Sequence, residues 1–262
     1  MGFNNNKNGL SNIESLLKKK NLSYNDHWNP SGVHYYKKNL FKGELEDLAD
    51  PVRSQIAYSL QYLDFLNVLI DDLKLNCIVE AELYKTYLIT AVSIIEAILN
   101  HVVIKKVKNG AKIKSEQLKK IARIEETKTV IENNGTIDGD TKFFRVSVVK
   151  PIDPPEYTNE PKLRDLIDIS KDLHCGLCNS AGYDTLHDLR EMRNRIHLTI
   201  DKMSQSDYNR FNKNWYYTVR VSLHFLLMCD KFDIVDPEVY DFIKLTEAEE
   251  KEFDELKKIK VK

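Results

Sequence analysis

The sequence predicts an all-α protein, and three observations support that fold class. Glycine and proline are scarce, at 9 and 7 of 262 residues, which argues against a β fold built from many tight turns. Apolar residues recur at helical spacing over long stretches, and two Ser/Thr-x-x-Glu capping boxes mark helix starts. With 42% hydrophobic residues, the chain can bury one large core. We therefore expect a helical bundle.

The N-terminal residues 1–43 are interpreted as an accessory arm. Ser11 and Glu14 form the first capping box and start a short helix that ends near Lys20. The loop that follows is rich in Tyr, His, Trp and Asn, and we assign it no chemistry.

Two long helices begin the predicted bundle. The first spans about 44–75, with Pro51 placed early enough to open its main part. The second spans about 79–107 and is apolar on most sides, so we expect it to be the most buried element. Its stretch 86–104 lacks Lys, Arg and Asp but contains Glu96, which favours a core helix of a soluble protein over a membrane span.

Residues 109–162 are interpreted as a small β-containing insertion. Asn133-Asn134-Gly135 indicates a turn, and 143–149 has the composition of a short strand. A cluster of prolines then excludes a continuous helix: Pro151, Pro154, Pro155 and Pro161.

Helices resume in the second half of the chain. One is expected at about 163–173, and Asp184 is the predicted N-cap of another that reaches about Ile200. Ser204 or Ser206 is the predicted cap of the helix after it.

The C-terminal part is predicted to be a helical tail. Asp236-Pro237 opens a short helix, and Thr246 with Glu249 forms the second capping box at the start of a charged, exposed segment. The bundle is therefore assigned to 44–230 and the tail to 231–262.

The charge of the chain is balanced, with 39 basic and 40 acidic residues. This balance excludes a globally basic nucleic-acid coat but allows a local basic patch. Residues 105–128 contain nine basic and three acidic residues, a net charge of +6. Lys105 and Lys106 open this segment and are candidate contacts for an RNA backbone, although exposed lysine runs are often simply solvated.

The four cysteines are too few for a disulfide framework in a chain of this size. Cys175 and Cys178 form a CxxC, but a structural zinc site usually needs a second pair. We expect no metal and no cofactor. No apolar stretch of signal-peptide length opens the sequence, so we expect a cytoplasmic protein without membrane contact.

The most informative polar pattern lies between Leu186 and Leu198. On a helical wheel at about 100° per residue, four polar residues form one strip along the edge of the apolar stripe. The strip consists of Arg190, Arg193, Asn194 and His197. Guanidinium groups donate paired hydrogen bonds to phosphate oxygens, and histidine moves protons near neutral pH. The strip therefore suits phosphodiester chemistry, and the alternative is that these side chains only cap or solvate the helix.

These residues resemble the motif of the HEPN superfamily (higher eukaryotes and prokaryotes nucleotide-binding), in which an Arg precedes a His by four to six residues. Six residues separate Arg190 from His197, which fits, while three separate Arg193 from His197. Arg193-Asn194 supplies the Arg-Asn pair common in the family. The resemblance covers roughly 44–107 and 163–230, and it implies a HEPN-like helical bundle.

The resemblance implies a metal-independent endoribonuclease of a prokaryotic toxin or anti-phage defence system. The RNA 2′-hydroxyl would attack the adjacent phosphate and leave a 2′,3′-cyclic phosphate, with His197 as acid/base, Arg190 or Arg193 stabilising the phosphorane, and Asn194 orienting them. It further implies a homodimer and an inhibitory or antitoxin partner. Other members are silent dimeric scaffolds or nucleotide/RNA-binding modules, and this alternative stays open.

Glu96 is the one carboxylate in the middle of the apolar helix. A buried carboxylate needs a cationic or hydrogen-bonding partner, and Arg190 and Arg193 are the two candidates. The alternative is that Glu96 reaches the bundle surface. We interpret Glu96 as a supporting residue of the polar strip.

Overall fold

The computed structural model describes residues 31–40, 42–123, 127–137, 140–150, 156–157, 161–195 and 211–259. Over these ranges the protein is predominantly helical, so the predicted all-α character is confirmed. The helices, in chain order, are α2 (Val33–Leu40), α3 (Asp50–Asp72), α4 (Cys77–Lys108), α5 (Ser115–Ile121), α6 (Leu163–Asp172), α7 (Ser180–Asn194), α8 (Lys213–Leu227) and α9 (Glu247–Ile259). Short 3-10 turns are η1 (Gly43–Leu45), η3 (Asp230–Phe232) and η4 (Pro237–Tyr240).

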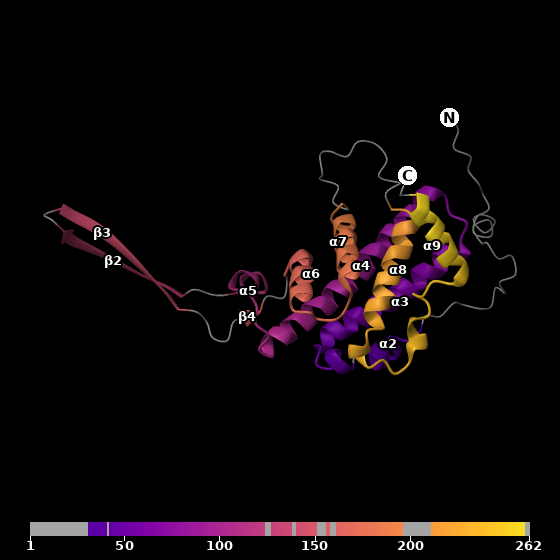
Figure 1. Ribbon diagram of the computed structural model, residues 1–262, viewed down its shortest axis with the longest axis horizontal. Helices are drawn as coiled ribbons and strands as arrows, with labels where there is room; N and C mark the ends of the chain where they lie inside the picture. The colour runs from indigo at the N-terminus through magenta and orange to yellow at the C-terminus, as the bar shows by residue number, and fades with distance from the viewer. Residues whose placement is uncertain are drawn as a thin grey trace, which may run out of the picture.

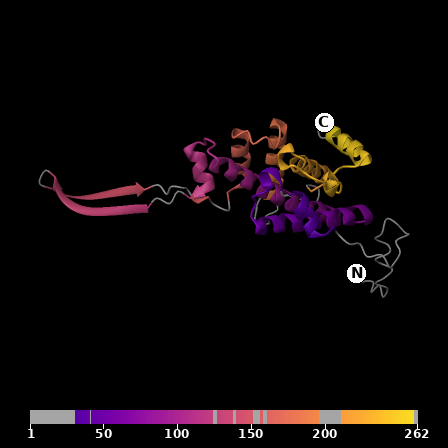
Figure 2. The same cartoon turned by 90° about the horizontal axis from the view of Figure 1, so that it is seen from below.

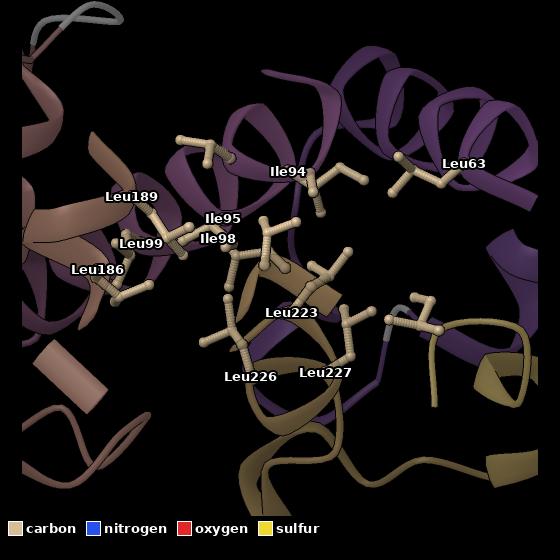
Figure 3. Close-up of a cluster of buried hydrophobic side chains, with 14 of the residues drawn as sticks. Leu63, Ile94, Ile95, Ile98, Leu99, Leu186, Leu189, Leu223, Leu226 and Leu227 are labelled. Atoms are coloured by element: carbon tan, nitrogen blue, oxygen red, sulfur yellow. The ribbon is translucent and has the colours of Figure 1, made fainter. Parts of the chain in front are cut away.

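Helix α4 is the centre of the bundle, and α3, α6, α7 and α8 all pack against it (Figure 1). Its N-cap is Asn76, whose side chain accepts a hydrogen bond from the Ile78 N–H at 3.0 Å. Figure 3 shows leucine and isoleucine side chains of α3, α4, α7 and α8 meeting in one cluster around this helix. The apolar sequence of α4 is thus explained by contacts on several sides.

The core extends beyond both boundaries that the sequence predicted for the bundle. Tyr36 and Leu40 of α2 are at most 1% exposed and belong to the same core as α4. Beyond residue 230, Phe232 and Tyr240 are fully buried in that core as well. The predicted boundaries at 43 and 231 stay predictions, and buried residues on both sides of each boundary share one core.

Two antiparallel strand pairs lie between α5 and α6. A two-residue pair, β1 (Ala122–Arg123) with β4 (Glu156–Tyr157), closes the base of the insertion. The long strands β2 (Thr127–Ile137) and β3 (Asp140–Lys150) form a ribbon that projects away from the helices (Figures 1 and 2).

The turn predicted at Asn133-Asn134-Gly135 is not where the ribbon reverses. Asn134 pairs with Phe143 and Gly135 with Lys142, so both lie within β2. Pairing continues to Ile137 with Asp140, which places the chain reversal after the Asn-Asn-Gly sequence. An Asn-Gly pair permits a turn but does not require one, and the register of the ribbon decided against it.

Arg220 on α8 joins that helix to α9 and to the segment before it. The side chain of Arg220 is 4% exposed. Its Nε donates to the Ile243 carbonyl at 3.1 Å, and its Nη2 donates to the Lys244 carbonyl at 2.8 Å. Its Nη1 forms an ion pair with Glu249, and the guanidinium lies 5.1 Å from the centre of the Tyr216 ring. We call this set of contacts the Arg220 clasp.

Both helix starts predicted for the C-terminal part are confirmed. Asp236 accepts a hydrogen bond from the Glu238 N–H at 3.2 Å, with Pro237 opening η4. Thr246 N–H donates to Glu249 Oε2 at 2.8 Å, and Glu249 N–H donates to Thr246 Oγ1 at 3.3 Å. The helix that follows, α9, is mostly exposed as predicted, and Phe253 is the residue that it buries where it packs on α8.

Candidate functional site

Helix α7 carries Arg190, Arg193 and Asn194 of the polar strip and begins earlier than predicted. The side chain of Asn179 accepts a hydrogen bond from the Gly182 N–H at 2.8 Å, so the helix starts at Ser180 and the prediction of Asp184 as N-cap is wrong. Asn and Asp cap equally well, and packing of Tyr183 against Ser170 on α6, with their hydroxyls 3.1 Å apart, accompanies the earlier start.

Helix α7 ends at Asn194 with Arg195 as its C-cap, before the predicted end at Ile200. His197, Ser204 and Ser206 lie outside the described residues. The N-cap of α8 is Asn212, whose side chain accepts from the Trp215 N–H at 3.3 Å. The predicted serine caps therefore do not open α8.

The two faces of α7 are arranged as the helical wheel predicted. Leu186, Leu189 and Met192 are buried against the core. Arg190 and Arg193 are partly buried, while Asn194 is exposed near the C-terminal end of the helix. The polar residues thus follow the edge of the buried stripe, where α7 meets α4.

Arg193 is held by an ion pair with Glu96 of α4. Arg193 Nη1 lies 2.8 Å from Glu96 Oε2, and the two side chains are 34% and 26% exposed. Of the two candidate partners for Glu96, the structure selects Arg193. The pair fixes one guanidinium at the boundary between the core and the surface while leaving part of it accessible.

Arg190 lies one turn earlier on α7 and is less exposed, at 18% for its side chain. Its Nη2 forms an ion pair with the neighbouring Glu191, and its Nε is buried without a hydrogen-bond partner in the described part of the chain. An unsatisfied buried donor costs free energy.

A groove of about 880 Å³ lies beside the Arg193–Glu96 pair. Ser93, Glu96 and Asn100 of α4 line it together with Gln55 of α3. Basic side chains, among them His101 and Lys105, line it near the C-terminal end of α4. The Oδ1 atom of Asn100 is buried there without a hydrogen-bond partner among the described residues. The helical pattern of α4 places Asn100 approximately along the face of Glu96, but it could not predict the groove, which exists only once α3, α4 and α6 are packed.

Lys105 and His101 share two acceptors at that end of the groove. Lys105 Nζ donates to Asp47 Oδ1 at 2.6 Å and to the Glu44 carbonyl at 2.9 Å. His101 Nε2 lies 3.2 Å and 3.1 Å from the same two oxygens. The hydrogen bond from Lys105 lowers the pKa of Asp47, while burial opposes that shift.

Lys106 is also engaged within the chain, because its Nζ donates to the His174 carbonyl at 3.2 Å. The ammonium groups of both candidate RNA contacts are therefore already hydrogen-bonded. Contact of Lys105 and Lys106 with RNA stays a prediction, and it would require these bonds to be shared or exchanged.

The cysteines of the CxxC do not form a recognisable metal centre. Cys175 is buried and Cys178 is partly buried, and all four cysteines are free thiols. Within the described ranges, no group of three or more His, Cys, Asp and Glu residues is placed to hold a metal ion.

Helix α4 is the one helix of the described chain that is long and apolar enough to cross a membrane. Of its most apolar 18-residue window, 56% is buried inside the bundle. Core helices of soluble proteins pass the same test of length and composition.

No family model matches this chain, and comparison with curated proteins and with solved structures gave no match.

Proposed function

We propose that this protein is a metal-independent endoribonuclease with a HEPN-like site on α7. The observation that carries the proposal is the 2.8 Å pair between Arg193 and Glu96. It holds a guanidinium at the edge of α7, next to Arg190 and Asn194 and shortly before His197 in the chain. When a neighbouring hydroxyl attacks a phosphodiester, protons must be moved and the negative charge that develops must be stabilised. A histidine can move the protons, and two arginines with an amide can stabilise the charge and orient the reacting groups.

In the proposed reaction, the 2′-oxygen of RNA forms a bond to the adjacent phosphorus and the bond from phosphorus to the 5′-oxygen breaks. His197 takes the proton from the 2′-hydroxyl and delivers one to the leaving 5′-oxygen. Arg193 and Arg190 stabilise the additional negative charge on the phosphorane. The products are a 2′,3′-cyclic phosphate and a 5′-hydroxyl, and no metal is needed.

The setting of this activity is part of the same proposal. We place the protein in the cytoplasm as a toxin or anti-phage effector that acts as a homodimer. Facing strips in two copies require an isologous interface. A ribonuclease of this type needs an inhibitory or antitoxin partner to spare its own cell. These statements derive from the resemblance of the Arg/Asn/His pattern to the HEPN motif.

The test is cleavage of single-stranded RNA by the purified protein in EDTA, followed by analysis of the product ends. We expect cyclic phosphate ends from the wild type and a loss of about 10²- to 10⁴-fold in rate for His197→Ala, as for removal of a general acid–base. His34→Ala, at an exposed position on α2, is the matched control and should cleave normally. Cleavage by His197→Ala at the wild-type rate, or activity that depends on a divalent metal, would contradict the mechanism.

A second candidate function is a silent RNA-binding scaffold. It is favoured by the ion pairs that already neutralise both arginines, Arg193 with Glu96 and Arg190 with Glu191. RNA binding without any cleavage, unchanged by His197→Ala, would support the scaffold over the enzyme.

A further inference from the structure

A second groove, of about 680 Å³, lies between α7, α8 and α9, and the ribonuclease proposal does not use it. Its lining is largely apolar and includes Leu186, Trp215, Val221, Phe225 and Phe253. Phe225 is 72% exposed, the highest exposure among the large hydrophobic side chains of the described residues. An exposed phenylalanine beside an apolar groove indicates a surface that another segment covers.

Neither Arg190 nor Arg193 lines the groove. The residues of α7 that line it lie between Ala181 and Asp188, in the part of the helix that precedes both arginines. An occupant confined to the groove would therefore leave Arg190 and Arg193 uncovered, and its docking does not depend on ribonuclease activity.

The rim of the groove is acidic. Asp188 and Asp230 line it, both are exposed, and neither forms an ion pair with another described residue. Lys257, also in the lining, is engaged: its Nζ lies 3.8 Å from the centre of the Phe253 ring and 3.5 Å from Asp254 Oδ1. The groove thus offers apolar surface and free carboxylates to an occupant that carries apolar anchors next to positive charges.

One segment of this chain has that chemistry. Between Ser11 and Lys20, Ile13, Leu16 and Leu17 follow the i, i+3, i+4 spacing of one helical face, and three consecutive lysines, Lys18 to Lys20, come directly after them. We propose that residues 11–20 dock in the α7–α8–α9 groove of the same chain, with the apolar residues over Phe225 and the lysines toward Asp188 and Asp230.

The connection is long enough for this docking. The described chain begins at Ser31, whose carbonyl accepts a hydrogen bond from Gln61 Nε2 at 2.8 Å on α3. The stretch from Lys20 to Ser31 can span at most about 40 Å when extended. This span exceeds the length of α7, which is about 22 Å, and α3 and α7 both pack against the same helix, α4.

Two native cysteines make the docking measurable in the full-length protein. Cys178 and Cys229 line the groove, whereas Cys77 is exposed at the start of α4. Burial, with a smaller contribution from Cys229, raises the pKa of Cys178 to about 11, so this thiol reacts slowly with an alkylating agent. A segment docked over the groove would slow the reaction further. Mass spectrometry can follow the alkylation of each cysteine separately, with Cys77 as the internal reference.

The variant to test is Lys18→Glu/Lys19→Glu/Lys20→Glu, with the corresponding triple Arg variant as matched control. We expect alkylation of Cys178 and Cys229 to become about tenfold faster in the Glu variant, the change expected when a docked state of about 90% is lost. The Arg variant and the rate at Cys77 should not change. Combining the Glu variant with Asp188→Lys/Asp230→Lys should restore slow alkylation, because the charges are complementary again.

Equal groove alkylation in the wild type and the Glu variant would overturn the proposal. Protection that increases with protein concentration would also overturn it, since the occupant would then be a second copy. Leu16→Asp/Leu17→Asp provides an independent check that removes the apolar anchors and keeps the lysines. Normal protection in that variant would contradict docking through the apolar face.

Discussion

Two Arg–Glu pairs join different helices among the described residues, and they differ in how many donors of the arginine are engaged. In the Arg220 clasp the Arg and Glu side chains are 4% and 18% exposed, and the guanidinium also donates to backbone carbonyls. In the Arg193–Glu96 pair the side chains are 34% and 26% exposed. Glu96 is the acceptor that Arg193 finds among the described residues.

The difference separates a structural arginine from one that can serve a ligand. Arg220 has its donors directed at fixed oxygens, so nothing is left for binding and its removal would orphan several buried groups. Arg193 is 34% exposed, and its one ion pair among the described residues, with the groove residue Glu96, sets its position. Residue type and even partner type are the same, so burial and the number of acceptors distinguish the two roles.

The largest effect is expected from breaking the clasp. Arg220→Met should reduce the free energy of unfolding by about 3–5 kcal/mol, because Glu249 and the carbonyls of Ile243 and Lys244 lose their donor in a buried place. Denaturant unfolding followed by circular dichroism measures this loss. Arg195→Met, at an exposed position, is the control and should change stability little. A loss below about 1 kcal/mol for Arg220→Met would show that Arg220 does not have this structural role.

An intermediate effect on stability is expected when Glu249, the acidic partner in the Arg220 clasp, is protonated. Burial raises the pKa of Glu249, but the Thr246 N–H and the charge of Arg220 outweigh it, so the pKa lies below its usual 4.5. A lowered folded pKa means that the stabilisation is present above that usual value and is lost as the pH falls through the folded pKa. Wild type should therefore lose more stability than Glu249→Gln between about pH 6 and pH 3. Parallel pH profiles for the two proteins would show that this carboxylate is not the group responsible.

The smallest effect is expected at the accessible pair. A double-mutant cycle with Glu96→Gln and Arg193→Gln should give a coupling energy of about 0.5–1 kcal/mol, because solvent screens a pair that is about one-third exposed. The same variants should change RNA cleavage or RNA affinity far more than they change stability. A coupling above about 2 kcal/mol would place Arg193 in the same structural class as Arg220.

The sequence predicted the local parts of this structure well. Thr246 and Glu249 form the expected capping box because its residues lie within one turn of helix. The wheel placed Arg193 on the edge of α7 because apolar periodicity marks the buried side. It could not choose between Arg190 and Arg193 for Glu96, since that choice depends on how α7 is set against α4.

Other features depend on contacts between distant segments. Asn179 and Asp184 are equally good capping residues, and tertiary packing decided between them. Arg220 stands in an apolar stretch of α8, as Glu96 does in α4. Two acceptors of the Arg220 guanidinium are backbone carbonyls, and because every residue has a carbonyl, the sequence does not show which ones accept. Both grooves are lined by residues from several helices, so the residue pattern of any single helix cannot predict them.

The paired base of the projecting ribbon makes it separable from the bundle. Ala122 pairs with Tyr157 and Arg123 with Glu156, so the chain leaves and re-enters the helical part at adjacent points. A short linker between those two points would bridge the gap that removal of β2 and β3 leaves. The same place is an attachment point at which a fluorescent or affinity domain can be inserted without separating α5 from α6.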